Sequence, residues 1–159
     1  MRRPCKCESP MYNTCMHDMK VDTRGQLMAL LHTASTVQSH ADVKLAAVGL
    51  SLPKLAALTA LSDAGESMPL SQLAERLSCV KSNITQLVDR LEADGFVTRS
   101  ADPNDRRARL AVLTPAGRDA YKKGTRIYAD TERDLLAGLE PAEARQLAAL
   151  MEKLERRIG

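Results

Sequence analysis

The chain has few aromatic residues: of its 159 residues, one is Phe, three are Tyr and none is Trp. Hydrophobic residues nevertheless make up 44% of it, and most of them are Leu and Ala. Strands of β-sandwiches and barrels are rich in β-branched and aromatic residues, whereas Leu and Ala favour helices. The composition therefore argues against an all-β architecture and predicts a mainly helical protein. The length suits a small domain with a dimerisation element.

Long hydrophobic runs are also missing. No stretch of about 18 apolar residues is present, so we expect no membrane span. The N-terminal residues lack the apolar segment of a signal peptide. We therefore expect a cytoplasmic protein, whose four Cys residues are thiols or metal ligands rather than a disulfide framework.

Enzyme motifs are missing as well. There is no Gly-rich phosphate loop, no nucleophile elbow and no pair of His residues at metal-binding spacing. The three His residues, His17, His32 and His40, form no recognisable triad with any Ser or Cys. We expect that the protein is not an enzyme and requires no cofactor.

Helical spacing of apolar residues predicts six helices. We expect them at residues 22–48, 51–64, 71–77, 81–94, 114–139 and 141–158. Ser51 is a candidate N-cap with Pro53 in the first turn, and Thr114-Pro115 is the same signal for the fifth helix. Residues 96–100 and 109–113 have strand patterns, with turn residues between them, and predict a β-hairpin.

Two short helices followed directly by a hairpin are the order of a winged helix-turn-helix. The second helix of this motif enters the major groove of DNA. With Ile84, Leu87, Val88 and Leu91 buried, its exposed face carries Lys81, Ser82, Asn83, Thr85, Gln86, Asp89 and Arg90. Such polar groups suit base edges and phosphates. The alternative is an ordinary solvated helix face.

The hairpin carries a local concentration of charge, although the net charge of the whole chain is only +3. Its candidate DNA-binding residues are Arg99, Arg106, Arg107 and Arg109. The acidic residues Asp102 and Asp105 lie between Arg99 and Arg106 in the sequence. A guanidinium group is attracted to the negative potential of a narrow minor groove. A nearby carboxylate holds such a side chain in position. The alternative is a salt-bridged solvent-exposed loop.

Three segments resemble the MarR family of bacterial regulators. They are residues 73–77 (LAERL), 85–97 (TQLVDRLEADGFV) and 102–117 (DPNDRRARLAVLTPAG), and the last one is the most specific. The resemblance covers about residues 22–158 and does not extend to residues 1–20. One departure is Val80, which stands where relatives have a small capping residue before the recognition helix.

The resemblance implies a mainly α fold with a small β-wing, assembled as an intertwined homodimer. The implied organisation is an arm (1–20), a dimerisation helix (21–50), a winged helix-turn-helix (51–113) and C-terminal dimerisation helices (114–159). The homodimer would bind a pseudo-palindromic operator in double-stranded DNA, and repression is the default of the family. The resemblance also implies that Arg107 enters the minor groove while Asp105 holds it.

Members of the family commonly respond to a small-molecule effector. The implied site is the crevice between the dimerisation helices and the DNA-binding lobe. Candidate residues in this chain are His32, Ser35, His40, Leu55 and Leu58. The alternative interpretation of the two His residues is an ordinary core or surface role.

The N-terminal arm is the unusual part of the sequence. It contains Cys5, Cys7, Cys15 and His17 within 13 residues, a set suited to soft metal ions. The same thiols could form a redox switch by oxidising to a disulfide, or the arm could be unstructured and without a role. A thiol- or metal-responsive regulator is therefore the alternative to a small-molecule one.

A protein-interaction module that reuses the fold is the remaining alternative function. A negative electrostatic potential over residues 81–109 would favour it, because DNA requires a basic surface there. The arginines of the hairpin favour DNA.

Overall fold

The computed structural model describes residues 25–78, 81–102 and 109–158. The chain divides into two compact units, residues 1–34 and 35–159. The described part of the first unit is the beginning of helix α1 (Gln26–Leu45), and its residues are exposed. The second unit contains the end of α1 and all other elements.

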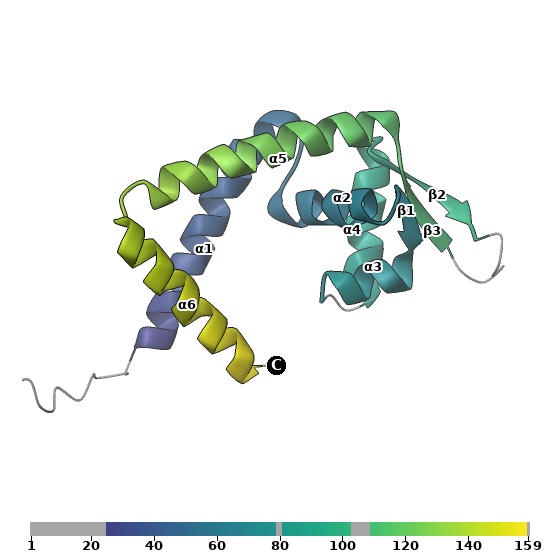
Figure 1. Cartoon of the computed structure of the whole chain (residues 1–159). Coiled ribbons are helices and arrows are strands. Elements are labelled where there is room, and N and C mark those ends of the chain that lie inside the picture. Colours follow the sequence, from purple (N-terminus) through teal and green to yellow (C-terminus); the bar gives the residue numbers. More distant parts are fainter. Residues whose placement is uncertain (1–24, 79–80, 103–108, 159) are drawn as a thin grey trace, which may run out of the picture. The chain divides into compact units, whose positions relative to one another are not determined.

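The second unit is helical apart from one small sheet (Figure 1). After α1 come the short 3-10 helix η1 (Ala46–Val48), α2 (Leu52–Asp63), β1 (Ser67–Pro69), α3 (Leu70–Arg76), α4 (Lys81–Ala93), β2 (Val97–Ala101), β3 (Arg109–Leu113), α5 (Pro115–Leu136) and α6 (Pro141–Ile158). These bounds agree with the predicted helices and hairpin to within a few residues. The predicted mainly helical fold with a small wing is confirmed.

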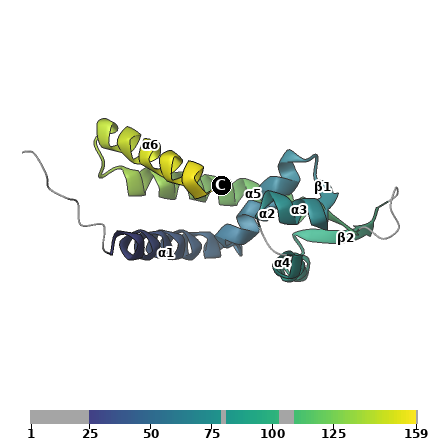
Figure 2. The same ribbon diagram turned by 90° about the horizontal axis from the view of Figure 1, so that it is seen from below.

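The sheet has three antiparallel strands in the order β1-β3-β2. Met68 of β1 lies opposite Ala111 of β3, and Arg99 of β2 lies opposite the same residue on the other side. Strand β1 has only three residues, and so short a segment acquires strand structure only by pairing. Helices α2, α3 and α4 gather beside the sheet in both views (Figures 1 and 2).

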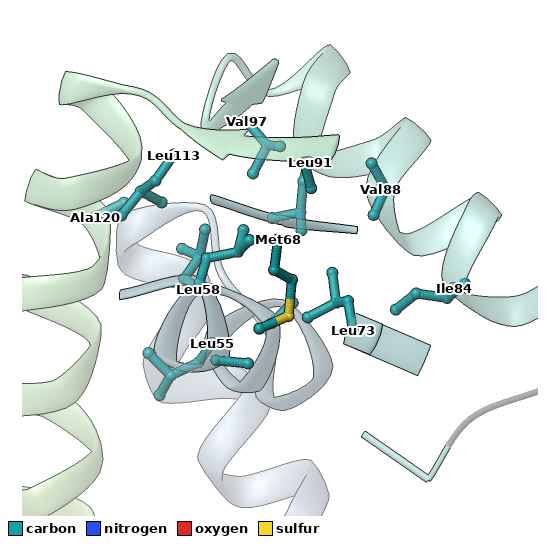
Figure 3. Packing of buried hydrophobic residues seen from close by; sticks show 14 of the residues in the cluster. Leu55, Leu58, Met68, Leu73, Ile84, Val88, Leu91, Val97, Leu113 and Ala120 are labelled. Atoms are coloured by element: carbon teal, nitrogen blue, oxygen red, sulfur yellow. The ribbon is translucent and has the colours of Figure 1, made fainter. Parts of the chain in front are cut away.

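One hydrophobic core joins α2, α3, α4 and the sheet (Figure 3). Its fully buried side chains include Leu58, Leu73, Val88, Leu91 and Val97. Ile84 is also buried, at 2% exposure, so three residues of the predicted inner face of α4 are confirmed. Burying a Leu or Val side chain contributes about 1.5–3 kcal/mol, so this face fixes the rotation of α4 about its axis.

The N-terminus of α2 is capped from outside its own sequence. Ser51 occupies the N-cap position with extended backbone, but its side chain makes no capping hydrogen bond. Instead, the backbone N–H of Leu52 donates to Oδ1 of Asp42, at 2.6 Å. The prediction that Ser51 caps α2 is therefore wrong, because the turn at Gly49 (φ 74°) brings a carboxylate of α1 to the helix end.

No single helix within the described ranges is long and apolar enough to cross a membrane. The bent pair 26–48 and 52–63 meets the requirement only when its two helices are taken together. The apolar composition of α2 has another cause, since five of its residues are buried in the core.

The start of α5 is fixed tightly to the end of the hairpin. The hydroxyl of Thr114 accepts a hydrogen bond from the N–H of Gly117, at 2.9 Å, which confirms the predicted cap. The backbone N–H of Thr114 donates to the carbonyl oxygen of Phe96, at 3.1 Å. At Gly117 a Cβ atom would lie 2.0 Å from the same carbonyl oxygen. Only glycine allows the helix to approach the backbone this closely.

We predict that Gly117→Ala destabilises the protein by about 2 kcal/mol or more, because backbone rather than a movable side chain blocks the new methyl group. Urea unfolding monitored by circular dichroism measures the change. Gly138→Ala is the matched control, since a Cβ there meets no atom within 4 Å and φ is not positive. We expect the control to change stability by less than about 1 kcal/mol. Equal effects of the two substitutions would contradict this account of Gly117.

Candidate nucleic-acid interface

Helix α4 presents a short polar surface to solvent. The exposed side chains include those of Ser82, Asn83, Thr85, Gln86, Asp89 and Arg90, opposite the buried Ile84, Val88 and Leu91. The backbone of α4 begins at Lys81, and Val80 lies outside the described residues. The predicted recognition helix is thus a helix with apolar residues inward and hydroxyl and amide groups outward.

The C-terminal end of α4 is anchored to α2. Nζ of Lys54 lies 2.6 Å from a carboxylate oxygen of Asp94, just after α4, and 3.3 Å from the carbonyl oxygen of Gly49. Gly95 then turns the chain with φ 75°, a conformation that glycine adopts without strain. These contacts hold the C-terminal end of α4 and leave the exposed residues of its N-terminal half to face a partner.

The two hairpin strands place the remaining candidates. Arg109 is exposed at the first position of β3, opposite Ala101 of β2. Asp105, Arg106 and Arg107 lie between the strands, outside the described residues. The proposed pairing of Asp105 with Arg107 therefore stays a prediction.

Arg99 lies in the predicted strand, and its guanidinium group is bound to helix α4. Nη1 donates to Oε2 of Glu92, at 2.8 Å, and Nη2 donates to a carboxylate oxygen of Asp89. Nη2 also lies 3.3 Å from the carbonyl oxygen of Thr85. The expectation that Arg99 binds DNA directly stays a prediction. Its charge is already matched by two carboxylates, so it links the wing to the recognition helix.

A cavity of about 560 Å³ lies between the end of α1, α2 and α5. The side chains that line it are mostly apolar, with amide and hydroxyl groups but no charged group: Gln38, Leu52, Pro53, Leu55, Ala56, Thr59, Thr125 and Tyr128. The hydroxyl of Thr59 donates to the carbonyl oxygen of Leu55, at 2.9 Å. The volume and the apolar lining are typical of a small-molecule site.

Of the five predicted effector residues, only Leu55 lines this cavity. Leu58 is fully buried in the core, because it lies almost one helical turn further along α2 and packs against the sheet side. Ser35 and His40 are exposed, and His40 lies two residues beyond Gln38 and so on the opposite side of α1. His32 is exposed in the first unit and is not among the lining residues.

The predicted metal or redox residues Cys5, Cys7, Cys15 and His17 lie outside the described residues. Across residues 25–78, 81–102 and 109–158, no group of three or more His, Cys, Asp or Glu side chains is arranged to hold a metal ion.

Sequence reasoning missed the carboxylate partners of Arg99. Asp89 and Glu92 lie three residues apart, the spacing that places two side chains on one helix face. Because β2 follows α4 after a short turn, an Arg in β2 can reach that face. This combination was visible in the sequence, whereas the lining residues Thr125 and Tyr128 carried no signal of their own.

The arrangement of α3, α4 and the hairpin on one core defines a winged helix-turn-helix domain. Residues 50–108 match the model of the MarR family, and over these residues the match agrees with the resemblance seen in the sequence.

A curated relative is the HTH-type transcriptional regulator YkoM of Bacillus subtilis (strain 168). It is 38% identical over 84 residues, which are 53% of this chain and 54% of the relative. The match therefore spans about half the length of each protein.

Solved structures extend the similarity in fold to most of the chain. The organohalide-sensing regulator RdhR-CbdbA1625, bound to 2,4-dichlorophenol, has a TM-score of 0.80 and 17% identity, covering 95% of this chain and 89% of that one. A MarR mutant from E. coli complexed with operator DNA has a TM-score of 0.70 and 23% identity, covering 84% and 98%. Sco5413, a MarR family regulator from Streptomyces coelicolor, has a TM-score of 0.75 and 23% identity, covering 87% and 96%.

Proposed function

We propose that this protein is a sequence-specific DNA-binding transcriptional regulator. The observation that carries the proposal is the polar outer face of α4, which a buried inner face and a fixed C-terminal end hold beside the hairpin. In this arrangement α4 lies in the major groove and the wing reaches the adjacent minor groove. The related MarR mutant solved with operator DNA supports the same use of the fold.

Within this surface, the side chains near the start of α4 read the bases. Asn83 and Gln86 offer amide groups, which suit adenine, while Ser82 and Thr85 offer hydroxyl groups to bases or phosphates. Lys81, Arg90, Arg106 and Arg109 bind phosphates and so supply affinity rather than sequence preference. Arg107, held by Asp105, enters the minor groove.

We predict that Arg107→Ala lowers affinity for a selected DNA site at least about tenfold, because a minor-groove guanidinium is lost. The probe is a fluorescent duplex that the wild-type protein selects from random DNA, and fluorescence anisotropy at several salt concentrations gives the dissociation constant. Arg133→Ala is the matched control, since this exposed side chain on α5 pairs with Asp130, three residues earlier in the same helix. Unchanged affinity of Arg107→Ala would show that the wing is assigned wrongly.

We also propose that the regulator is a homodimer. Large apolar side chains of α6 are strongly exposed, namely Leu147 (40%), Leu150 (51%), Met151 (48%) and Leu154 (47%). In the first unit, Leu27 and Met28 at the start of α1 are exposed at 67% and 69%. Exposed apolar surface of this kind on a helix typically marks a protein interface. A second copy of the chain is the proposed partner, and the resulting two-fold symmetry calls for a pseudo-palindromic operator.

We predict that Leu150→Glu converts a dimer of about 35 kDa into the 17.4 kDa monomer, because a carboxylate cannot be buried unpaired in an apolar interface. Size-exclusion chromatography with light scattering measures the mass. Ala149→Glu introduces the same charge on the opposite face of α6, about 100° from Leu150 and further from Met151, and should remain dimeric. A dimeric Leu150→Glu variant would remove α6 from the interface.

The regulator is further proposed to be a repressor that a small molecule releases from DNA. A dimer bound across its operator excludes other proteins from that DNA, so repression is the simplest result of binding. The cavity beside α2 is the proposed effector site. Its lining has no charged side chain, so an uncharged ring compound fits it better than an anion. The relative solved with 2,4-dichlorophenol supports testing a phenol.

We predict that 2,4-dichlorophenol raises the melting temperature of the wild-type protein by about 3 °C or more and weakens DNA binding, while benzoate has a smaller effect. Ala56→Leu places a larger side chain in the cavity and should weaken both responses without weakening DNA binding. Ala149→Leu adds the same atoms to α6, away from the lining residues, and should respond like the wild type. A normal response of Ala56→Leu would show that the cavity is not the effector site.

A further inference from the structure

The contact between Arg99, Asp89 and Glu92, here called the Arg99 clamp, joins the wing to the recognition helix. Arg99 stands on β2, and the two carboxylates stand one turn apart on α4. Its side chain is 26% exposed, against 54% for Asp89 and 39% for Glu92. The arginine is thus the less accessible member, held between α4 and β2 rather than extended into solvent.

The clamp also includes the backbone of β2. The N–H of Arg99 donates to Oε1 of Glu92, at 3.1 Å, while its side chain donates to Oε2 of the same carboxylate. In the sheet order β1-β3-β2, strand β2 is at the edge, so its outward N–H groups have no strand partner. Glu92 satisfies one of them and receives the guanidinium at the same time. A single exposed ion pair contributes little, but a network with a backbone bond fixes geometry.

The charges of the clamp add to one negative charge, close to the exposed face of α4. Without Arg99 two carboxylates would face the path of the DNA backbone, which carries one negative charge per phosphate. Arg99 therefore has two consequences for a DNA-binding surface. It sets the position of the hairpin relative to α4, and it neutralises a carboxylate that would otherwise repel phosphate.

We propose that Arg99 is a positioning residue for DNA binding, which acts through Asp89 and Glu92 rather than through a contact with DNA. The proposal rests on the DNA-binding function proposed above. Arginine suits this role because its planar fork donates to both carboxylates at once, whereas lysine presents a single point charge. The clamp thereby orients the minor-groove element against the major-groove helix.

The test measures DNA affinity of Arg99→Ala on the wild-type-selected fluorescent duplex over a range of salt concentrations. We expect a loss of roughly tenfold, within the coupling range of residues in one network. The salt dependence should keep the wild-type slope, since no phosphate contact is removed. Arg99→Lys should lose only part of the affinity. Asp89→Asn in the Arg99→Ala background should recover part of it, because the uncompensated carboxylate is gone. Arg133→Ala is again the control.

A second measurement needs no DNA. Amide hydrogen exchange of the free Arg99→Ala variant should rise about tenfold or more in residues 97–101, while the buried part of α2 keeps wild-type protection. A salt slope reduced by about one, with wild-type exchange in residues 97–101 and no recovery by Asp89→Asn, would overturn the proposal and make Arg99 a direct phosphate ligand.

The two measurements separate this proposal from the DNA-binding function. If the wild-type protein selects no duplex, the proposed function fails, and the link between wing and helix is judged by exchange alone. Wild-type exchange in residues 97–101 of the variant then overturns the clamp as well.

Discussion

Helix α4 is held at its C-terminal end and along one side, and this constraint organises the rest of the domain. Lys54 of α2 holds Asp94 just after the helix, and Arg99 of β2 holds Asp89 and Glu92 on its outer side. Ile84, Val88 and Leu91 anchor the inner side in the core. The exposed residues at the start of α4 remain available for a ligand, yet their positions are fixed by contacts that the ligand does not touch. A recognition helix needs this combination, because its contacts distinguish one base sequence from another only when the side chains are already held in position before binding.

The same contacts connect the elements on which the proposed regulation depends. The first turn of α2 lines the cavity through Leu52, Pro53 and Leu55, and Lys54 of that turn is the residue that holds the end of α4. A molecule that displaces this turn would therefore act on a residue bonded to the recognition helix. At Gly117, α5 packs closely against the carbonyl oxygen of Phe96. The same helix supplies Thr125 and Tyr128 to the cavity. The proposed effector site and the proposed DNA-binding surface are thus built from elements that pack on the same small core.

Much of the fold was predictable because its signals are local. The spacing of apolar residues gave the helices and the inner face of α4, and Thr114 and Pro115 marked the start of α5. The errors came where a distant residue decided the outcome. Ser51 has the right type and position for a cap, but the N–H of Leu52 donates to Asp42, which lies ten residues before Leu52. Leu58 was a candidate for the effector site, but it is fully buried in the core.

The candidate site divides in the same way. The sequence by itself determined that α4 is an amphipathic helix with hydroxyl and amide groups outward, since a period of 3.6 residues assigns each side chain to a face. It also determined the order of helix, turn, helix and hairpin that marks the family. Only the tertiary structure decided what the charged groups do. An arginine is equally compatible with DNA, solvent or a carboxylate until its neighbours are known, because Coulomb energy depends on distance and solvation rather than on residue type. For Arg99, the fold places two carboxylates within reach, so a residue that the sequence assigned to DNA joins the two parts of the proposed DNA-binding surface.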